Sequence, residues 1–186
     1  MNKVPLVINL FGAPGAGKST GAAHIFSELK QRGVNAELVT EFAKDKTWEG
    51  NTLALSCQEY VFGKQSYRLA RCRDDVDVII TDSPLPLAII YNTNPALGQP
   101  FNEVILNVFD TYDNLSYYIV RNKPYNPKGR NQTETESDAL GGDIEAMLQH
   151  FTIPYKIIEG DKDGYEYILG DVYEKLTEKG IVVYGE

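Results

Sequence analysis

Short apolar runs alternate with longer amphipathic segments along this chain. The run Val4–Phe11 predicts a buried strand. The segment after it predicts a helix from about Lys18 to Arg32, closed by Gly33. Further strands are expected at 36–40, 76–81, 115–120 and 153–158, a small extra one at 181–184, and helices at 52–73, 101–112, 137–151 and 164–179. Strands that alternate with helices predict an α/β fold, a parallel sheet with helices on both faces.

One long polar insertion, Arg121–Ser137, interrupts this alternation. It is rich in proline, asparagine, glycine and charge, and it follows the fourth expected strand. A loop of this length inside a compact domain is usually functional, for instance as a lid. The length of 186 residues predicts a single domain over residues 1–186, with the insertion as part of it.

Composition narrows the class of protein. The hydrophobic fraction of 42% and the charged fraction of 24% are typical of a soluble globular domain. No stretch reaches the ~20 apolar residues that a membrane helix needs. Cys57 and Cys72, expected on one long helix, lie too far apart there for a disulfide, so reduced thiols and a cytoplasmic location are expected. The net charge of −8 argues against a protein that coats DNA, but a local basic patch would still allow a nucleic-acid substrate.

A glycine-rich turn follows the first expected strand and fits the pattern G-x-x-x-x-G-K-[ST] without a mismatch. Glycines let the backbone wrap around phosphate, and the helix that follows aims its positive end at the same anion. Lys18 is expected to reach the β- and γ-phosphates, and the Ser19 hydroxyl to ligate Mg²⁺. The residues expected to bind the nucleotide are Gly12, Ala13, Pro14, Gly15, Ala16, Gly17, Lys18, Ser19, Thr20 and, from the insertion, Lys128.

Two carboxylates follow expected strands and are candidates for the same crevice. Asp82 ends the run VDVIITD, where it would hold Mg²⁺ with Ser19 or accept a proton; a turn or helix-cap aspartate is the alternative. Glu41 ends LVTE, and residues just beyond the carboxyl ends of parallel strands line the ligand site of such folds. Glu41 is therefore a candidate general base or substrate ligand, with a solvated loop residue as the alternative.

The insertion carries four cations, Arg121, Lys123, Lys128 and Arg130. Phosphoryl transfer needs positive charge on the moving group and exclusion of water, and a closing basic loop supplies both. Arg121 and Arg130 are the predicted catalytic arginines. A solvated basic loop is the alternative interpretation.

The acceptor is expected between the second and third strands. The predicted substrate residues there are Glu41, Lys44, Trp48, Gln58, Gln65 and Arg68. Gln58 and Gln65 are seven positions apart, hence on one helical face, where amides can read a base edge. Trp48, in the polar loop KDKTWEG, would either stack on a base or anchor that loop on the core.

Three segments together, GAPGAGKST, TDSP and RNKPYNPKGRNQTETES, resemble the small P-loop kinase group that includes nicotinamide riboside kinase domains and many bacteriophage ATP-binding proteins. The resemblance implies a P-loop NTPase fold of three layers (α/β/α), with strand order 2-3-1-4-5. It also implies an ATP–Mg²⁺ donor, whose adenine lies against the loop 160–165, and a hydroxyl acceptor on a nucleoside-like molecule. The segments VTEFAKDKTWEG and QEYVFGKQ are most similar to the phage branch that phosphorylates 5-hydroxymethyluracil in DNA.

The sequence therefore predicts a kinase, with 5-hydroxymethyluracil in phage DNA as the favoured acceptor. A kinase of a free nucleoside or nucleotide, of deoxynucleotide or nicotinamide riboside type, is one alternative, and a regulatory nucleotide-binding NTPase is another. The sequence leaves open whether Asp82 or Glu41 is the general base, whether ATP is preferred to GTP, and whether the chain forms a homodimer.

Overall fold

The computed structural model describes residues 4–128 and 132–185, which fold around one parallel sheet. The strands are β1 (Leu6–Phe11), β2 (Ala36–Val39), β3 (Val78–Thr81), β4 (Asp113–Val120) and β5 (Lys156–Glu159). Their order is β2-β3-β1-β4-β5 and every pairing is parallel, so the predicted α/β fold and strand order are confirmed. β1 lies at the centre, with Ile8 opposite Ile80 of β3 and Leu115 of β4.

Helices connect the strands. They are α1 (Lys18–Gln31), α2 (Phe42–Trp48), α3 (Thr52–Ser56), α4 (Gln58–Ala70), α5 (Leu87–Tyr91), α6 (Gly98–Phe109), α7 (Glu134–His150) and α8 (Lys162–Glu178). Within the described ranges, no helix has the length and apolar character required to cross a membrane.

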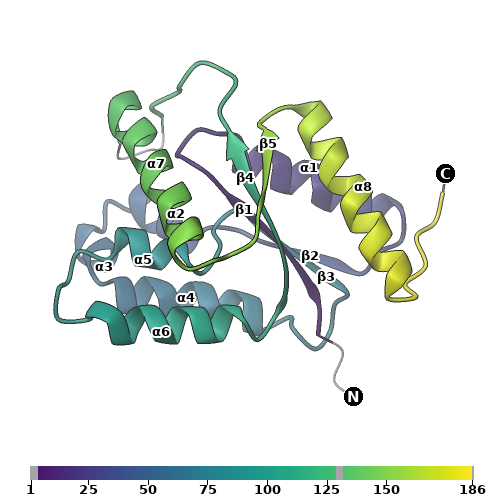
Figure 1. Ribbon diagram of the computed structural model, residues 1–186, viewed down its shortest axis with the longest axis horizontal. Helices are drawn as coiled ribbons and strands as arrows, with labels where there is room; N and C mark the ends of the chain where they lie inside the picture. The colour runs from purple at the N-terminus through teal and green to yellow at the C-terminus, as the bar shows by residue number, and fades with distance from the viewer. Residues whose placement is uncertain (1–3, 129–131, 186) are drawn as a thin grey trace.

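The helices cover both faces of the sheet (Figure 1). Side chains alternate along a strand, so Leu6, Ile8 and Leu10 of β1 pack toward α1 and α8. Val7 and Phe11 point the other way and pack with residues of α4, α6 and α7. Because both faces are buried, the central strands are apolar except for Asn9 and Thr81, which is why they were recognisable in the sequence.

The prediction of one continuous helix at 52–73 is wrong, because the structure has two helices there. The backbone of Cys57 is non-helical, with φ −96° and ψ 83°, and it separates α3 from α4. Asn51 caps α3 by accepting a hydrogen bond from the Ala54 amide at 3.0 Å. Cys57 and Cys72 therefore do not share a helix, although both are free cysteines as expected.

Two short helices were not expected from the sequence. The segment that contains Trp48 is helical, as α2, rather than a polar loop. α5 follows the turn after Asp82 and has only five residues. Elements this short show too few repeats for their periodicity to be recognised.

The start of β5 and the last residues of the chain also differ from the prediction. β5 begins at Lys156 rather than Ile153, because the Ile153 amide donates to the Leu148 carbonyl and completes the end of α7. Residues 181–184 form no strand. Instead, the Tyr184 amide donates to the Arg32 carbonyl at 2.9 Å, and the Tyr184 ring packs on Gly33.

Candidate active site

The glycine-rich turn connects β1 to α1 and has the backbone that only glycine adopts easily. Gly12 and Gly17 have φ values of 137° and 112°. A Cβ atom on Gly12 would lie 2.5 Å from the Ile119 carbonyl oxygen. The turn is thus packed directly against β4, which leaves no room for a side chain.

Two side chains from distant helices hold this turn in place. The Ser137 hydroxyl, fully buried at the start of α7, donates to the Pro14 carbonyl at 2.8 Å. The Tyr165 hydroxyl on α8 donates to the Gly17 carbonyl at 3.0 Å. Neither contact was expected from the sequence, because each joins residues more than 100 positions apart.

Lys18 lies across the turn. Its ammonium group donates to the carbonyls of Gly12 and Ala13 at 2.7 and 3.0 Å. A positive charge is therefore held at the mouth of the phosphate-binding turn, beside the backbone amides and the N-terminus of α1.

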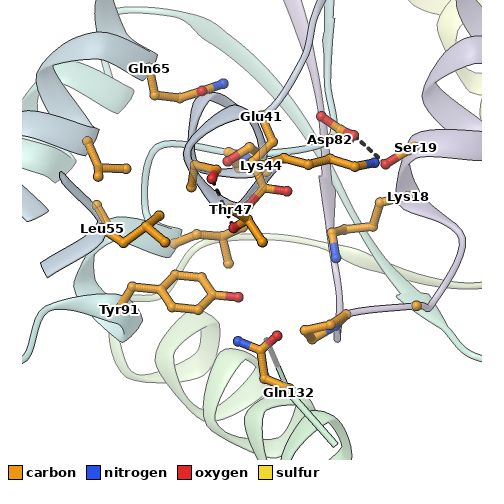
Figure 2. A pocket seen from close by; sticks show the side chains of 18 of the residues that line it. Lys18, Ser19, Glu41, Lys44, Thr47, Leu55, Gln65, Asp82, Tyr91 and Gln132 are labelled. Carbon is orange, nitrogen blue, oxygen red and sulfur yellow. Dashed lines mark hydrogen bonds between the residues drawn. The ribbon is translucent and has the colours of Figure 1, made fainter. Parts of the chain in front are cut away.

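Ser19 and Asp82 form the site in which Mg²⁺ would be held. The Ser19 hydroxyl donates to Asp82 Oδ2 at 2.5 Å, as drawn in Figure 2. Asp82 is buried, and its other oxygen, Oδ1, has no hydrogen-bond partner among the residues that the structure describes. A buried carboxylate oxygen without a partner beside a hydroxyl is a donor set that suits Mg²⁺, which takes one or two protein oxygens together with phosphate oxygens and water.

A cavity of about 470 Å³ opens from the turn toward α2–α5 (Figure 2). One half is lined by Lys18, Ser19 and Asp82. The other half lies against apolar side chains such as Leu55 and Phe62, with a few polar groups between them. This volume is within the usual range for small-ligand sites.

Glu41 faces the same cavity, immediately after β2. Burial raises the pKa of its carboxyl above the ordinary 4.5, the positive charge of Lys18 opposes this, and the negative charge of Asp82 adds to it. A carboxylate beside the phosphate site with a raised pKa is a suitable proton acceptor.

The cations of the insertion divide into two groups. Lys123 and Lys128 line the cavity. Arg121, expected in catalysis, lies elsewhere: its guanidinium contacts Asp138 at 2.5 Å and Glu134 at 3.2 Å, because these carboxylates project from the first turns of α7. Arg130 lies outside the described residues. The irregular part of the insertion is also shorter than expected, since α7 begins at Glu134 with a capping box made by Thr133 and Glu136.

Four of the expected substrate residues line the cavity, namely Glu41, Lys44, Gln58 and Gln65. The amide of Gln65 is already engaged, because its oxygen accepts from the Phe42 amide at 2.9 Å and its nitrogen lies 3.4 Å from the Thr40 carbonyl. It supports the junction of β2 and α2.

Two expected substrate residues lie outside the cavity lining. The guanidinium of Arg68 instead forms an ion pair with Asp45 at 2.5 Å and donates to the Thr40 carbonyl at 3.0 Å. Trp48 is 69% exposed at the end of α2, so it does not anchor the segment on the core, and its ring is not part of the cavity wall. Tyr91 and Gln132, by contrast, line the cavity and were missed. The apolar run LPLAIIY after Asp82 was the available signal for Tyr91.

A second cavity, of about 370 Å³, lies on the other side of the turn. It is lined by Thr20 and His24 of α1, by Lys123, and by Gly160, Asp161, Lys162 and Tyr165 of the segment expected to bind adenine. Asp161 caps α8 through the Gly164 amide at 3.0 Å and accepts from Asn122 at 2.6 Å. Thr20 and Lys123 line both cavities, so a nucleotide that spanned them would lie beside these two residues.

Replacing Gly160 with alanine should destabilise the protein and weaken nucleotide binding together. A Cβ atom there would lie 2.0 Å from the Ala16 carbonyl oxygen, a rigid part of the turn. We expect a loss of about 2–3 kcal/mol in the free energy of unfolding, measured in urea. Gly170→Ala is the matched control, because Gly170 lies within α8 with no atom within 4 Å of the added carbon, and it should stabilise by about 0.5–1 kcal/mol. Equal stability of both variants would contradict this packing.

The turn at the start of α1, the Ser19–Asp82 pair and the parallel sheet define the class: a P-loop nucleotide-binding fold. A family model described as an AAA domain matches residues 7–164, and the chain belongs to this family. No protein with a curated description matches the chain.

Solved structures share the fold. The structure of deoxyadenosine kinase from M. mycoides with the products dCMP and a flexible dCDP bound has a TM-score of 0.52 at 16% sequence identity, covering 92% of this chain and 99% of that one. The structure of the same kinase with bound dATP has a TM-score of 0.49 at 18% identity, with the same coverage. At 16% identity, the first of these two likenesses shows the fold and nothing further.

Proposed function

We propose that the chain is an ATP-dependent kinase that transfers the γ-phosphoryl group to a hydroxyl of a nucleoside-like acceptor. The observation that carries this proposal is that Lys18, the Ser19–Asp82 pair and Glu41 line the same cavity as a group of mostly apolar side chains from α2–α5. A protein that only hydrolyses nucleotide needs space for one water molecule beside the phosphate. A space large enough for a nucleoside is better explained by transfer to an acceptor.

The residues have separate tasks in this proposal. The turn and Lys18 hold the phosphates, and Lys18, Lys123 and Lys128 supply positive charge to the transferring group. Ser19 and Asp82 would hold Mg²⁺, which would neutralise part of the phosphate charge when bound. Glu41 orients the acceptor hydroxyl and accepts its proton, since it faces the same cavity and Asp82 is paired with Ser19.

For the acceptor, we propose 5-hydroxymethyluracil in DNA, on the basis of the sequence resemblance of residues 39–50 and 58–65 to the phage branch. Such a base would enter the cavity flipped out of the duplex or from a single strand. The exposed Trp48 and Lys44 at the acceptor side are available to contact the strand.

A free nucleoside or nucleotide is the second candidate acceptor, and a specific observation favours it. Three cations on the acceptor side are engaged in ion pairs: Lys46 with Glu49, Arg68 with Asp45 and Arg71 with Glu37. This leaves less positive surface for a DNA backbone than the sequence suggested. The fold shared with a deoxyadenosine kinase is compatible with a small acceptor.

An assay with γ-labelled ATP, Mg²⁺ and a panel of acceptors tests both the kinase activity and the identity of the acceptor. The panel contains free deoxynucleosides, deoxynucleotides, nicotinamide riboside, unmodified DNA and DNA with 5-hydroxymethyluracil. Label on the modified DNA alone supports the first acceptor, and label on free nucleosides alone refutes it in favour of the second. Strong hydrolysis without any acceptor, or tight binding without turnover, would refute the kinase and indicate a regulatory NTPase or a binding module.

A further inference from the structure

Tyr91 enters the cavity from the wall formed by α5. It is the last residue of this helix, three and four positions after Ala88 and Leu87, which are buried on the same face. Figure 2 shows its ring extending into the cavity, with the hydroxyl at the inner end. Leu55, Thr47 and Gln132 line the same space.

The chemical state of this hydroxyl is fixed by its surroundings. Burial raises the pKa of Tyr91, and the negative charge of Glu41 raises it further. The group therefore remains a neutral O–H donor at physiological pH. Within residues 4–128 and 132–185 it makes no hydrogen bond, so its donor is available to a ligand.

Tyr91 is only partly buried, and its hydroxyl faces the cavity rather than the packed side of α5. A phenylalanine would fill the same apolar wall, so the packing of α5 does not require the hydroxyl. A bound molecule that offers an oxygen at the centre of the cavity would give this donor a partner.

We propose that Tyr91 is an acceptor-binding residue that donates a hydrogen bond to a carbonyl or hydroxyl oxygen of the acceptor. The ring of the acceptor would lie among Leu55, Val61 and Phe62, and this bond would hold its reacting hydroxyl near Glu41. The inference rests on the proposed kinase function and adds a residue that determines which acceptors bind.

Steady-state kinetics of Tyr91→Phe, which keeps the ring and removes only the donor, tests the proposal. We expect the KM for the acceptor to rise about tenfold, as for the loss of one hydrogen bond, with the KM for ATP unchanged. Tyr67→Phe is the matched control, because Tyr67 is 68% exposed on α4 and outside the cavity. An acceptor KM within twofold of wild type, or an equal rise in both KM values, would overturn the proposal.

A binding measurement separates this proposal from the proposed function. Calorimetric titration of the deoxynucleosides of the panel, in the presence of a non-hydrolysable ATP analogue, needs no turnover. Binding that weakens about tenfold in Tyr91→Phe supports the role of Tyr91 even if the wild type transfers no phosphate. Single-stranded DNA with 5-hydroxymethyluracil is titrated in the same way. Equal affinity of both proteins for every acceptor that binds, or no binding of any acceptor to either protein, would overturn the proposal.

Discussion

Replacing Lys18 with alanine should lower the rate of phosphoryl transfer about 10³-fold or more while leaving the fold intact. The ammonium group is the positive charge placed within the phosphate-binding turn, where it contacts the carbonyls of Gly12 and Ala13. No backbone amide can supply a full positive charge to the γ-phosphoryl group in its place. The measurement is single-turnover transfer from labelled ATP, together with the thermal unfolding curve.

Lys30→Ala is the control for this variant. Lys30 lies on the same helix, exposed in the last turn of α1 and away from both cavities. It should transfer phosphate at the wild-type rate. If Lys18→Ala kept more than a tenth of that rate, the turn would not be the donor site.

Replacing Glu41 with glutamine should lower kcat by about 10²–10⁴-fold, the usual contribution of a general base. The wild-type kcat/KM should also fall as the pH drops through the pKa of Glu41, because only the ionised carboxylate accepts a proton. Burial places that pKa above 4.5, so the loss begins at a higher pH than for an exposed glutamate. This acid limb should be absent from Glu41→Gln.

The thermal stability of Glu41→Gln tests the raised pKa of Glu41 independently of catalysis. The raised pKa means that the folded state binds the proton more tightly than the unfolded state. Stability therefore falls as the pH rises from 4.5 to the raised pKa of the folded state, and it is constant above that. Glutamine removes that cost, and Glu41→Gln should unfold at no lower temperature than wild type at neutral pH.

Glu37→Gln serves as the control, since Glu37 lies on β2, four positions before Glu41, and contacts Arg71 at 3.4 Å outside the cavity lining. A Glu41→Gln enzyme that kept its kcat would assign the proton transfer to Asp82.

The parts of this protein that could be predicted are those encoded by neighbouring residues. The phosphate-binding turn is contiguous, and the buried strands are short apolar runs, so both can be recognised locally. Asp82 and Glu41 followed from the rule that strand ends share one edge of a parallel sheet.

The remaining features depend on contacts between distant residues. Whether Arg121 points to phosphate or to α7 depends on Glu134 and Asp138, which become its neighbours only when α7 folds back along the insertion. The sequence suggests that the Gln65 amide could bind a base, but in the folded chain its oxygen accepts a hydrogen bond from the Phe42 amide. Tyr91 lies on a helix too short to show periodicity.

The two hydroxyls that hold the phosphate-binding turn have a consequence for how nucleotide binds. Ser137 and Tyr165 fix the turn through hydrogen bonds within the folded chain, so much of its conformational entropy is lost when the protein folds rather than when ATP arrives. The turn is a preorganised anion receptor, and its backbone need not rearrange during encounter. Differences in affinity among nucleotides should therefore arise mainly in dissociation rates, through contacts with the insertion and with the loop before α8.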